Sequence, residues 1–376
     1  MELPDLNQQP ESVPAWVKVR NLWVKNEKYL AAEFFLAGFL FDIITLKRID
    51  EWLTIIQQGI FLLAAVFLLI LKTKNWSPPE KWPGFLHKGW GYRVEAMHFL
   101  FGSLLSAFTV FYFKSSSLVV SFGFLAVLCA LLVANELKRF QGLELPFKWA
   151  LLTLCLVSYL SYLAPIVLGF IGVTTFLVSV VLTSLVLWLV YRHLAKGNQS
   201  GNLNLKKLLL YPAVGVMVFF IVAYMMQWVP PVPLSLKFVG IYHQVQRTED
   251  GHYELHHQKP WWNFWHNGDQ DFKSLSGDKI YCYFRLFSPG GFKDEIRLHW
   301  LLKDPKRGWT TQDKIPLKVT GGRAEGFRGF GAKSNYSAGK WRVQVETTEG
   351  REIGRIYFNV SEAKNPFDRQ FMIDRQ

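Results

Sequence analysis

The chain has 376 residues, of which 50% are hydrophobic and only 19% are charged, with a formal net charge of +13. Soluble domains usually carry about 25% charged residues, so this composition indicates a membrane protein. Cys129 and Cys155 lie in apolar runs and Cys282 in the more polar C-terminal part, so we expect no disulfide within the chain. The first 28 residues are polar and mixed in charge, so we expect no cleavable signal peptide.

Seven apolar runs are long enough for helices that cross a bilayer core of about 30 Å. They cover residues 29–46, 52–71, 94–113, 118–137, 147–167, 168–191 and 208–229. Only the segment around Pro165 and Gly169 separates the fifth run from the sixth, so these two could also form a hairpin with a buried turn. We therefore predict an N-terminal segment, 1–28, followed by a helical transmembrane domain of about seven spans, 29–230.

Lysine and arginine are distributed unevenly between the loops of such a domain. If residues 1–28 are cytoplasmic, sixteen basic residues lie on the cytoplasmic side, whereas the short opposite loops hold three, Lys47, Arg48 and Lys114. Cytoplasmic loops are enriched in Lys and Arg, which favours this orientation. An odd number of spans then places the C-terminal part outside the cytoplasm, which in a Gram-negative bacterium is the periplasm.

The hydrophobic periodicity changes from helical to alternating after a proline-rich linker, 231–235. Such a linker is short and stiff, so the following domain should lie close to the membrane surface. Alternating patterns and turn signals predict strands over 237–246, 253–257, 279–287, 295–302, 310–319, 328–334, 341–347 and 353–360. These predict an all-β sandwich of the immunoglobulin-like class over 236–361, followed by a frayed tail, 362–376.

The C-terminal half resembles the bacterial family called domain of unknown function 2914. The resemblance rests on residues 297–360, with a Trp-bearing strand, a basic hairpin, the segment GFRGFGAK and a final G-x-W-x-V hairpin at Gly339, Trp341 and Val343. The apolar half is similar to the multispan segment that often precedes this domain, notably in FGSLLSAFTVFYFKSSS and ALLVANELKRFQ. The resemblance implies a bacterial inner-membrane protein with a C-terminal β domain, and it implies no activity and no catalytic residues.

Ionisable residues within membrane spans are candidates for function because burying them is costly. The predicted spans contain a polar cluster near their cytoplasmic ends, formed by Glu33, Glu95, His98, Asn135 and Glu136. This cluster could serve a proton, an ion or a small substrate. Alternatively it pairs with nearby basic residues at the interface and only fixes helix packing.

Two groups in the soluble part are candidates for contact with a ligand or with the membrane. One is the aromatic segment with Trp261, Trp262 and Trp265, which could form core, anchor the domain at the headgroups or stack on a glycan or peptide. The other is a basic hairpin between two tryptophans, which could face anionic headgroups or acidic polymer; its residues are Trp300, Lys303, Lys306, Arg307 and Trp309.

No catalytic nucleophile motif, phosphate loop or zinc-type spacing occurs, so we expect no metal and no cofactor. The histidines between 252 and 266 fit solvated side chains better than a metal set. We therefore favour a non-enzymatic inner-membrane protein whose periplasmic domain binds or senses an envelope component. The expected partners are membrane lipids and an envelope glycan or envelope protein, but not nucleic acid. The alternatives are a transporter or enzyme that uses the polar cluster, with the β domain accessory, and an assembly factor.

Overall fold

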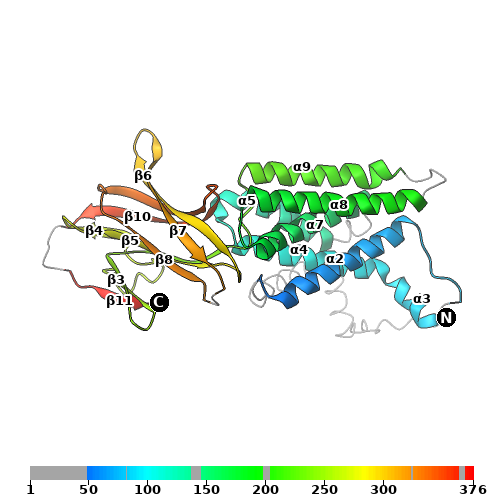
Figure 1. Ribbon diagram of the computed structural model, residues 1–376, viewed down its shortest axis with the longest axis horizontal. Helices are drawn as coiled ribbons and strands as arrows, with labels where there is room; N and C mark the ends of the chain where they lie inside the picture. Colours follow the sequence, from blue (N-terminus) through cyan, green and yellow to red (C-terminus); the bar gives the residue numbers. More distant parts are fainter. Residues whose placement is uncertain (1–48, 82, 137–144, 198–203, 323–324, 364–368) are drawn as a thin grey trace, which may run out of the picture.

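The computed structural model describes residues 49–81, 83–136, 145–197, 204–322, 325–363 and 369–376. It consists of a helical bundle and a β domain that sits on one end of the bundle, so that the helices run along the long axis of the molecule (Figure 1). The predicted first span, 29–46, lies outside the described residues.

Six of the seven predicted spans correspond to helices. The helices are α2 (Trp52–Thr73), α3 (Gly84–Gly91), α4 (Arg93–Lys114), α5 (Leu118–Glu136), α7 (Leu145–Leu168), α8 (Val173–Gly197), η1 (Lys206–Leu210) and α9 (Tyr211–Met225). Within the described part of the chain, α2, α4, α7, α8 and the η1–α9 unit are long and apolar enough to span a membrane, whereas the apolar part of α5, Val119–Ala134, is shorter. This indicates a multi-pass membrane protein.

The tight connection between the fifth and sixth predicted spans separates two complete helices. Helix α7 runs to Leu168, and Gly169 then adopts a φ of +82° while its N–H bonds to the carbonyl of Pro165 at 2.8 Å. A glycine in this left-handed conformation is a common way to end a helix. Helix α7 is the central helix of the bundle, because it contacts α2, α4, α8 and α9 and buries every residue from Lys148 to Ser158 except Ala150.

Apolar side chains cover the outer faces of the bundle, and small hydroxyl residues lie inside it. The exposed side chains on α2 and α8 include Leu53, Leu63, Val181 and Leu185. Such a distribution suits contact with lipid tails on the outside, while buried hydroxyls bond to carbonyls of the preceding helical turn. Thr153, for example, donates to the carbonyl of Trp149 at 2.8 Å.

The β domain contains two sheets that share one hydrophobic core. The first sheet has the order β1–β5–β8, with bounds Ser235–Tyr242, Ile280–Phe287 and Phe327–Lys333. The second has the order β4–β10–β9–β6–β7, with bounds Asp271–Ser274, Glu352–Glu362, Gly339–Thr347, Lys293–Asp304 and Gly308–Thr320. Ile241 and Phe284 of the first sheet face Trp300 and Val343 of the second, all fully buried.

A third, smaller sheet lies on the outer face of the first. It has the order β11–β3–β2, with bounds Met372–Arg375, Tyr253–His257 and Gln244–Arg247. Tyr242 and Tyr283 point out of the first sheet and pack against Val245 and Leu255 of the third. The tail that was expected to fray therefore contains a strand, β11, which the sequence prediction missed along with β4.

Each of the six long described helices has one end against the β domain. The hydrogen bonds at this junction join Gly290 to Asp50 before α2, Ser235 to Lys114 of α4, Glu352 to Ser117 before α5, Lys293 to Gly169 after α7, Asp294 to Ile171 before α8 and Arg351 to Tyr224 of α9. The domain is therefore docked on the bundle and not held by the linker alone.

The turn between β9 and β10 inserts two opposite charges between helix ends. Glu349 Oε1 accepts the N–H of Val173 at 2.7 Å, at the start of α8. Arg351 Nη2 donates to the carbonyl of Tyr224 at 2.9 Å, in the last turn of α9, and its guanidinium lies 3.4 Å from the centre of the Tyr224 ring. An acid at a helix N-terminus and a base at a C-terminus both complement the helix dipole. The turn thus fits the bundle electrostatically.

The opposite end of the bundle carries most of the described basic residues of the helical half. These are Lys72, Lys74, Lys81, Lys88, Arg93, Lys148, Arg192, Lys196, Lys206 and Lys207. Lys74 Nζ lies 2.8 Å from His193 Nε2, so the ends of α2 and α8 meet there. The β domain and this basic end are at opposite ends of the helices.

Candidate functional site

The long connection between β1 and β5 builds a concave surface on the β domain. It contributes β2, β3, an aromatic loop formed by residues 258–268, and β4. The loop ends beside β1, because Ile241 N–H bonds to the carbonyl of Asn267 at 3.2 Å and Asp269 N–H bonds to the carbonyl of Ile241 at 2.7 Å. At Gly268 a Cβ would lie 2.0 Å from the Ile241 oxygen, so only glycine allows this approach.

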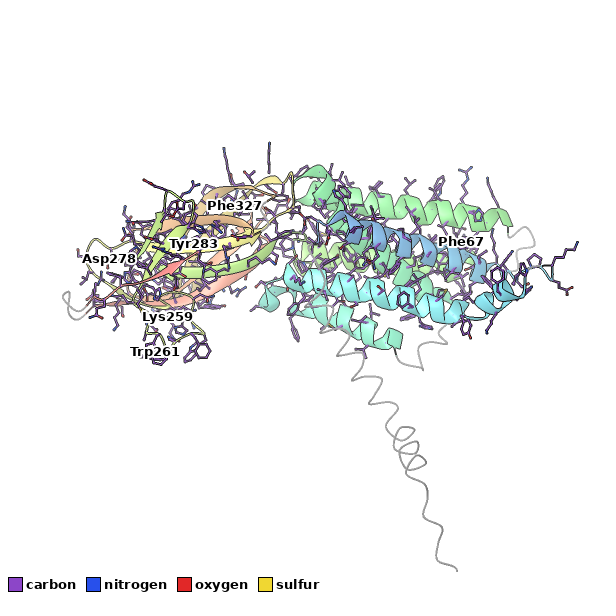
Figure 2. The ribbon with its side chains drawn as sticks, turned by 90° about the horizontal axis from the view of Figure 1, so that it is seen from below. Phe67, Lys259, Trp261, Asp278, Tyr283 and Phe327 are labelled. Atoms are coloured by element: carbon purple, nitrogen blue, oxygen red, sulfur yellow. The ribbon has the colours of Figure 1, made fainter. Side chains whose placement is uncertain are left out.

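The aromatic loop is held by hydrogen bonds across it. Lys259 Nζ donates to the carbonyl of His266 at 2.7 Å, and Asn263 Nδ2 lies 2.8 Å from His266 Nδ1. Its rings nevertheless face solvent, with Trp261 81% and Trp265 64% exposed, and Figure 2 shows Trp261 projecting from the side of the β domain. Exposed rings on a fixed loop are unusual in a domain that has a complete core, and they indicate a contact surface.

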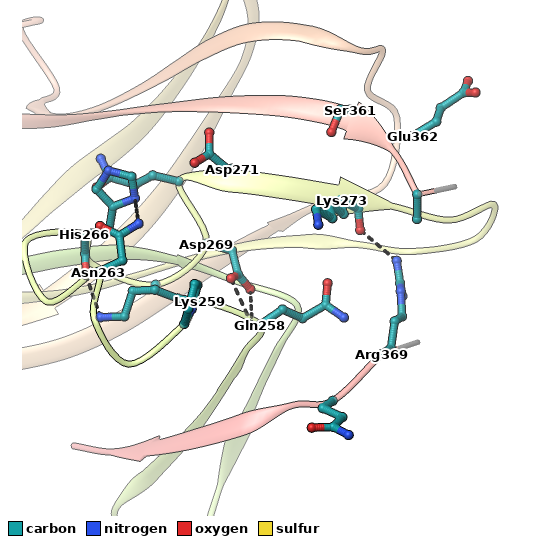
Figure 3. A pocket seen from close by; sticks show the side chains of 15 residues that line it. Gln258, Lys259, Asn263, His266, Asp269, Asp271, Lys273, Ser361, Glu362 and Arg369 are labelled. Atoms are coloured by element: carbon teal, nitrogen blue, oxygen red, sulfur yellow. Dashed lines mark hydrogen bonds between the residues drawn. The ribbon is translucent and has the colours of Figure 1, made fainter. Parts of the chain in front are cut away.

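A pocket of about 930 Å³ lies between this loop, β4 and the end of β10. Figure 3 shows its polar lining, to which these residues contribute: Gln258, Lys259, Pro260, Asn263, His266, Gly268, Asp269, Gln270, Asp271, Lys273, Ser361, Glu362, Ala363, Arg369 and Gln370. This volume is at the upper end of the range for small-molecule sites.

Asp269 is the most buried charged group of the pocket, with 4% of its surface exposed. Both of its carboxylate oxygens lie 2.9 Å from the N–H of Gln258, and Oδ2 lies 3.4 Å from His243 Nε2. Burial raises the pKa of Asp269 to about 7 and, together with the charge of Arg369, lowers the pKa of His243 to about 4. Asp269 therefore fixes the base of the aromatic loop and titrates near neutral pH.

Arg369 closes the far side of the pocket. Its guanidinium donates to both carboxylate oxygens of Asp278, at 2.6 and 3.2 Å, and to the carbonyl of Lys273 at 2.7 Å. Burial opposes ionisation of Asp278, but these hydrogen bonds prevail and hold its pKa below the ordinary value. The interaction ties the C-terminal strand to the loop that precedes β5.

The pocket lies at the end of the β domain away from the helices. Strand β10 starts at the junction, where Glu352 accepts a hydrogen bond from Ser117, and ends at the pocket with Ser361 and Glu362. Ten residue steps of strand correspond to about 33 Å. The aromatic loop and the pocket thus lie far from the bilayer that would surround the bundle.

The basic hairpin also lies away from the helices. Strand β6 leaves the junction at Lys293 and turns into β7 after Asp304, about 36 Å further on. Asp304 Oδ1 accepts the N–H groups of Lys306 and Arg307 at 2.8 Å each, so the turn is closed by its own backbone. This distance does not favour contact of Lys303, Lys306 and Arg307 with the headgroups around the bundle.

The two tryptophans that flank the hairpin differ in their surroundings. Trp300 is 0% exposed and belongs to the core between the two sheets, so it is not available to a ligand or a membrane and is removed from the predicted contact set. Trp309 lies on the outer face of the five-stranded sheet, where the Arg342 guanidinium sits 4.7 Å from its ring centre and Tyr357 packs beside it. Its ring is thus partly covered by neighbours.

The predicted intramembrane polar cluster falls largely outside the described side chains. Glu33 lies outside the described residues, and the side chains of Glu95, Asn135 and Glu136 also lie outside them. His98 is a half-buried residue of α4.

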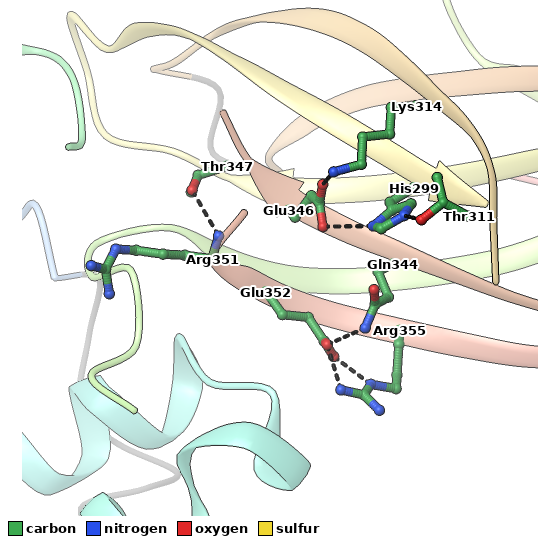
Figure 4. A network of polar contacts seen from close by, with 9 residues as sticks. All are labelled: His299, Thr311, Lys314, Gln344, Glu346, Thr347, Arg351, Glu352 and Arg355. Atoms are coloured by element: carbon green, nitrogen blue, oxygen red, sulfur yellow. Dashed lines mark hydrogen bonds and ion pairs between the residues drawn. The ribbon is translucent and has the colours of Figure 1, made fainter. Parts of the chain in front are cut away.

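A polar network covers the outer face of the five-stranded sheet (Figure 4). His299 Nδ1 lies 3.0 Å from Glu346 Oε2, and His299 Nε2 lies 2.8 Å from Thr311 Oγ1. A hydroxyl, an imidazole and a carboxylate in line can activate a nucleophile when a substrate cleft adjoins the hydroxyl. None of the three residues lines the 930 Å³ pocket, and they lie on the three neighbouring strands β7, β6 and β9. Their arrangement accounts for cross-strand stabilisation.

The described residues hold no group of three His, Cys, Asp or Glu side chains placed to bind a metal ion. Two of the histidines between 252 and 266 have partners within the protein. His266 takes part in the hydrogen bonds of the aromatic loop, and His257 Nε2 lies 3.3 Å from Asp374 Oδ2 of β11. The wall of the pocket consists of hydrogen-bond donors and acceptors of the protein.

Sequence reasoning found the aromatic segment but missed the pocket beside it. Asp269, Asp278 and Arg369 belong to no motif, and Arg369 is about a hundred residues from the loop that it faces. The only local signal was the polar turn NGDQD after the aromatic segment.

Comparison with protein families gives one match, to the family described as "Protein of unknown function (DUF2914)", over residues 293–360. No curated protein matches the chain. The matched residues comprise β6 to β9 and most of β10, whereas every residue that lines the 930 Å³ pocket lies outside the match. The chain carries a C-terminal DUF2914 domain, of unknown function, behind a helical half with five candidate membrane spans.

Proposed function

We propose that this chain is a multi-pass protein of the bacterial inner membrane that binds an envelope component through the pocket at the far end of its β domain. The helical bundle anchors the domain, and the docked junction holds the pocket away from the bilayer. The observation that carries the proposal is the 930 Å³ polar pocket beside an exposed, hydrogen-bonded aromatic loop.

The distribution of charge supports a periplasmic position for the β domain. The basic residues of the helical half gather at the end opposite to the domain, and that end is expected to be cytoplasmic. This argument does not depend on the number of spans, because it uses only the end of the described helices on which the domain sits.

The strand order supports classification of the two-sheet core as an immunoglobulin-like sandwich. If β1, β5 and β8 are strands A, B and E, then β6, β7, β9 and β10 are strands C, C′, F and G. The parallel pairing of β4 with β10 would then place a second part of strand A beside G, and Trp300 occupies the buried position on strand C. Loops at one end of such sandwiches often carry the binding site, and the proposed pocket also lies at one end of the domain.

A retention experiment tests the proposed function. The full chain in lipid nanodiscs is incubated with purified peptidoglycan, with outer-membrane fragments or with vesicles of anionic phospholipid, and the bound fraction is measured. The double substitution Asp271→Asn and Ser361→Ala changes exposed groups of the pocket wall, and we expect it to abolish retention. Lys303→Ala with Lys306→Ala on the basic hairpin is the matched control, and we expect it to retain the wild-type level. The proposal is refuted if the wild-type chain retains none of the three envelope fractions, or if the pocket variant retains them as well as the wild type does.

Thiol labelling tests the orientation. Lys273→Cys in β4 should react with a membrane-impermeant maleimide once only the outer membrane is permeable, whereas Lys88→Cys in α3 should react only after the inner membrane is lysed. The native cysteines are buried or half-buried and provide the background. The reverse pattern would place the pocket in the cytoplasm.

A further inference from the structure

We infer that the ligand of the distal pocket is an uncharged, polyhydroxylated molecule, that is, a saccharide chain, and not an anionic or a lipid ligand. This inference rests on the proposed function and specifies its ligand. Three features of the pocket carry it: the engagement of its charges, the supply of uncharged hydrogen-bonding groups and the exposed rings beside it.

The strongest charges of the pocket are already engaged within the protein. Lys259 is bound to the carbonyl of His266, Arg369 to the carboxylate of Asp278, and Asp269 to the N–H of Gln258. A phosphate or sulfate ligand requires free Arg or Lys groups that can bind its oxygens. Here an anion would have to compete with the Asp278 carboxylate for Arg369, while Lys259 already directs one of its three N–H donors into its own loop.

The remaining charged groups of the wall do not favour an anion either. Asp271, Lys273 and Glu362 are all exposed and together carry one positive and two negative charges. An anionic ligand would meet a rim that is negative on balance. Carboxylates accept hydrogen bonds from hydroxyl groups, so the same rim suits a polyol.

Uncharged hydrogen-bonding groups complete the wall. Gln258, Asn263 and Gln370 present amides, and Ser361 presents a hydroxyl. Asn263 Oδ1 is buried and has no hydrogen-bond partner among the described residues, although its amide nitrogen is bound to His266. Amides, a hydroxyl and carboxylates form the donor and acceptor set that matches sugar hydroxyls.

The aromatic loop supplies the apolar half of a saccharide site. Trp261 and Trp262 meet edge to face with ring centres 6.0 Å apart, and Phe264 and Trp265 do so at 5.0 Å, so each pair keeps open ring faces. The hydrogen bonds across the loop hold the segment that carries these rings before any ligand arrives, which reduces the entropy lost on ordering the loop. A pyranose ring has an apolar C–H face and polar edges, so it can stack on the rings while its hydroxyls enter the pocket.

The position of the site argues against lipid as the source of the hydroxyl groups. The pocket lies at the end of β10 that is farthest from the helices, about 33 Å of strand from the junction. Headgroups of the bilayer around the bundle do not reach this height. A glycan that extends through the periplasm does.

Calorimetric titration of the full chain in nanodiscs tests the inference with two probes, chitotetraose (an uncharged tetrasaccharide) and inorganic phosphate. We expect saturable binding of chitotetraose, no displacement by phosphate, and a loss of affinity of about tenfold or more for Trp261→Ala with Trp265→Ala, which equals about 1.4 kcal/mol. Phe330→Ala, which removes an exposed ring of β8, is the matched control and should bind like the wild type. Unchanged thermal unfolding of both variants shows that the domain is intact.

The other outcomes overturn the inference in distinguishable ways. Binding of phosphate in place of the saccharide, or saccharide binding that the loop substitutions leave unchanged, refutes the assigned ligand or its site. If chitotetraose does not bind but retention of an envelope fraction still depends on Asp271 and Ser361, the saccharide inference fails and the proposed function stands. If neither probe binds and no retention depends on the pocket, both fail.

Discussion

Removal of the Glu349 carboxylate should loosen the β domain from the helices. Glu349 Oε1 accepts the N–H of Val173 at 2.7 Å, and Oε2 lies 3.6 Å from Nε of Arg351. Arg351 is 6% exposed, so neighbouring protein groups, and not water, stabilise its charge. The substitution Glu349→Ala leaves a helix N-terminus without its acceptor and a buried guanidinium without its carboxylate.

The magnitude follows from these contacts. A hydrogen bond to a charged group contributes about 1.5–3 kcal/mol, and an acid at a helix N-terminus about 0.3–1 kcal/mol. The Glu349 side chain is 32% exposed, so water screens part of this, and we take the lower end of the sum, about 2 kcal/mol. Opening of the junction should therefore become about thirtyfold more frequent. Glu349→Gln keeps an acceptor for Val173 but removes the charge, so its effect should be smaller.

Hydrogen exchange of the full chain in nanodiscs measures this opening. Peptides that cover residues 169–176 and 222–229 should lose protection in Glu349→Ala, while peptides from the core strands β6 and β9 should not change. Glu325→Ala is the control, because Glu325 pairs with Arg328 while 68% exposed, and such pairs contribute little. If Glu349→Ala exchanges within twofold of the wild type at both helix ends, the assigned role of the junction charges is wrong.

Two further predictions concern the base of the aromatic loop. Gly268→Ala should lower the thermal unfolding temperature and abolish pocket-dependent retention, because the new Cβ would lie 2.0 Å from the Ile241 oxygen. Gly251→Ala is the control: Gly251 also has a positive φ, but no atom lies within 4 Å of the new Cβ, so only the smaller conformational cost is expected. Equal effects of the two substitutions would contradict the clash. The second prediction concerns pH. The pKa of Asp269 is raised to about 7, so the contribution of Asp269 to the free energy of unfolding is lost as pH rises from about 4 to 7. The pKa of His243 is lowered to about 4, so the contribution of His243 is lost as pH falls from about 6.5 to 4. The two slopes oppose each other in the wild type, so Asp269→Asn should make the unfolding temperature rise more steeply between pH 4.5 and 6.5, and an unchanged slope would refute the assignment.

Periodicity predicted the elements well where each segment has one strongly apolar face. The spans that became α2, α4, α7, α8 and α9 and the strands β3, β5, β9 and β10 fall close to their predicted positions. Their signal is local, since an apolar run of about 20 residues or a period of two is visible within the segment itself. Strands β4 and β11 have four residues each and no apolar run, so their pairing decides their structure.

The candidate site was less accessible to prediction from the sequence. Trp300 was grouped with the basic hairpin as a contact residue, yet it is fully buried, whereas Trp261 of the aromatic segment is 81% exposed. The residue type does not distinguish these two environments, because the packing of the two sheets against each other covers Trp300. The basic hairpin was predicted as a unit, but its distance from the helices follows from the direction of β6 after the junction.

The sequence by itself determined that apolar helices precede a β domain, that the domain contains the DUF2914 region and that basic residues favour one side of the spans. These properties are sums over neighbouring residues, so they survive without knowledge of distant contacts. Only the tertiary structure decided that Glu349 and Arg351 meet helix ends, that Asp269 closes the aromatic loop and that Arg369 completes a pocket with residues about a hundred positions away. Hydrogen bonds and burial between distant segments depend on which segments the fold brings into contact, and no local sequence pattern specifies these contacts.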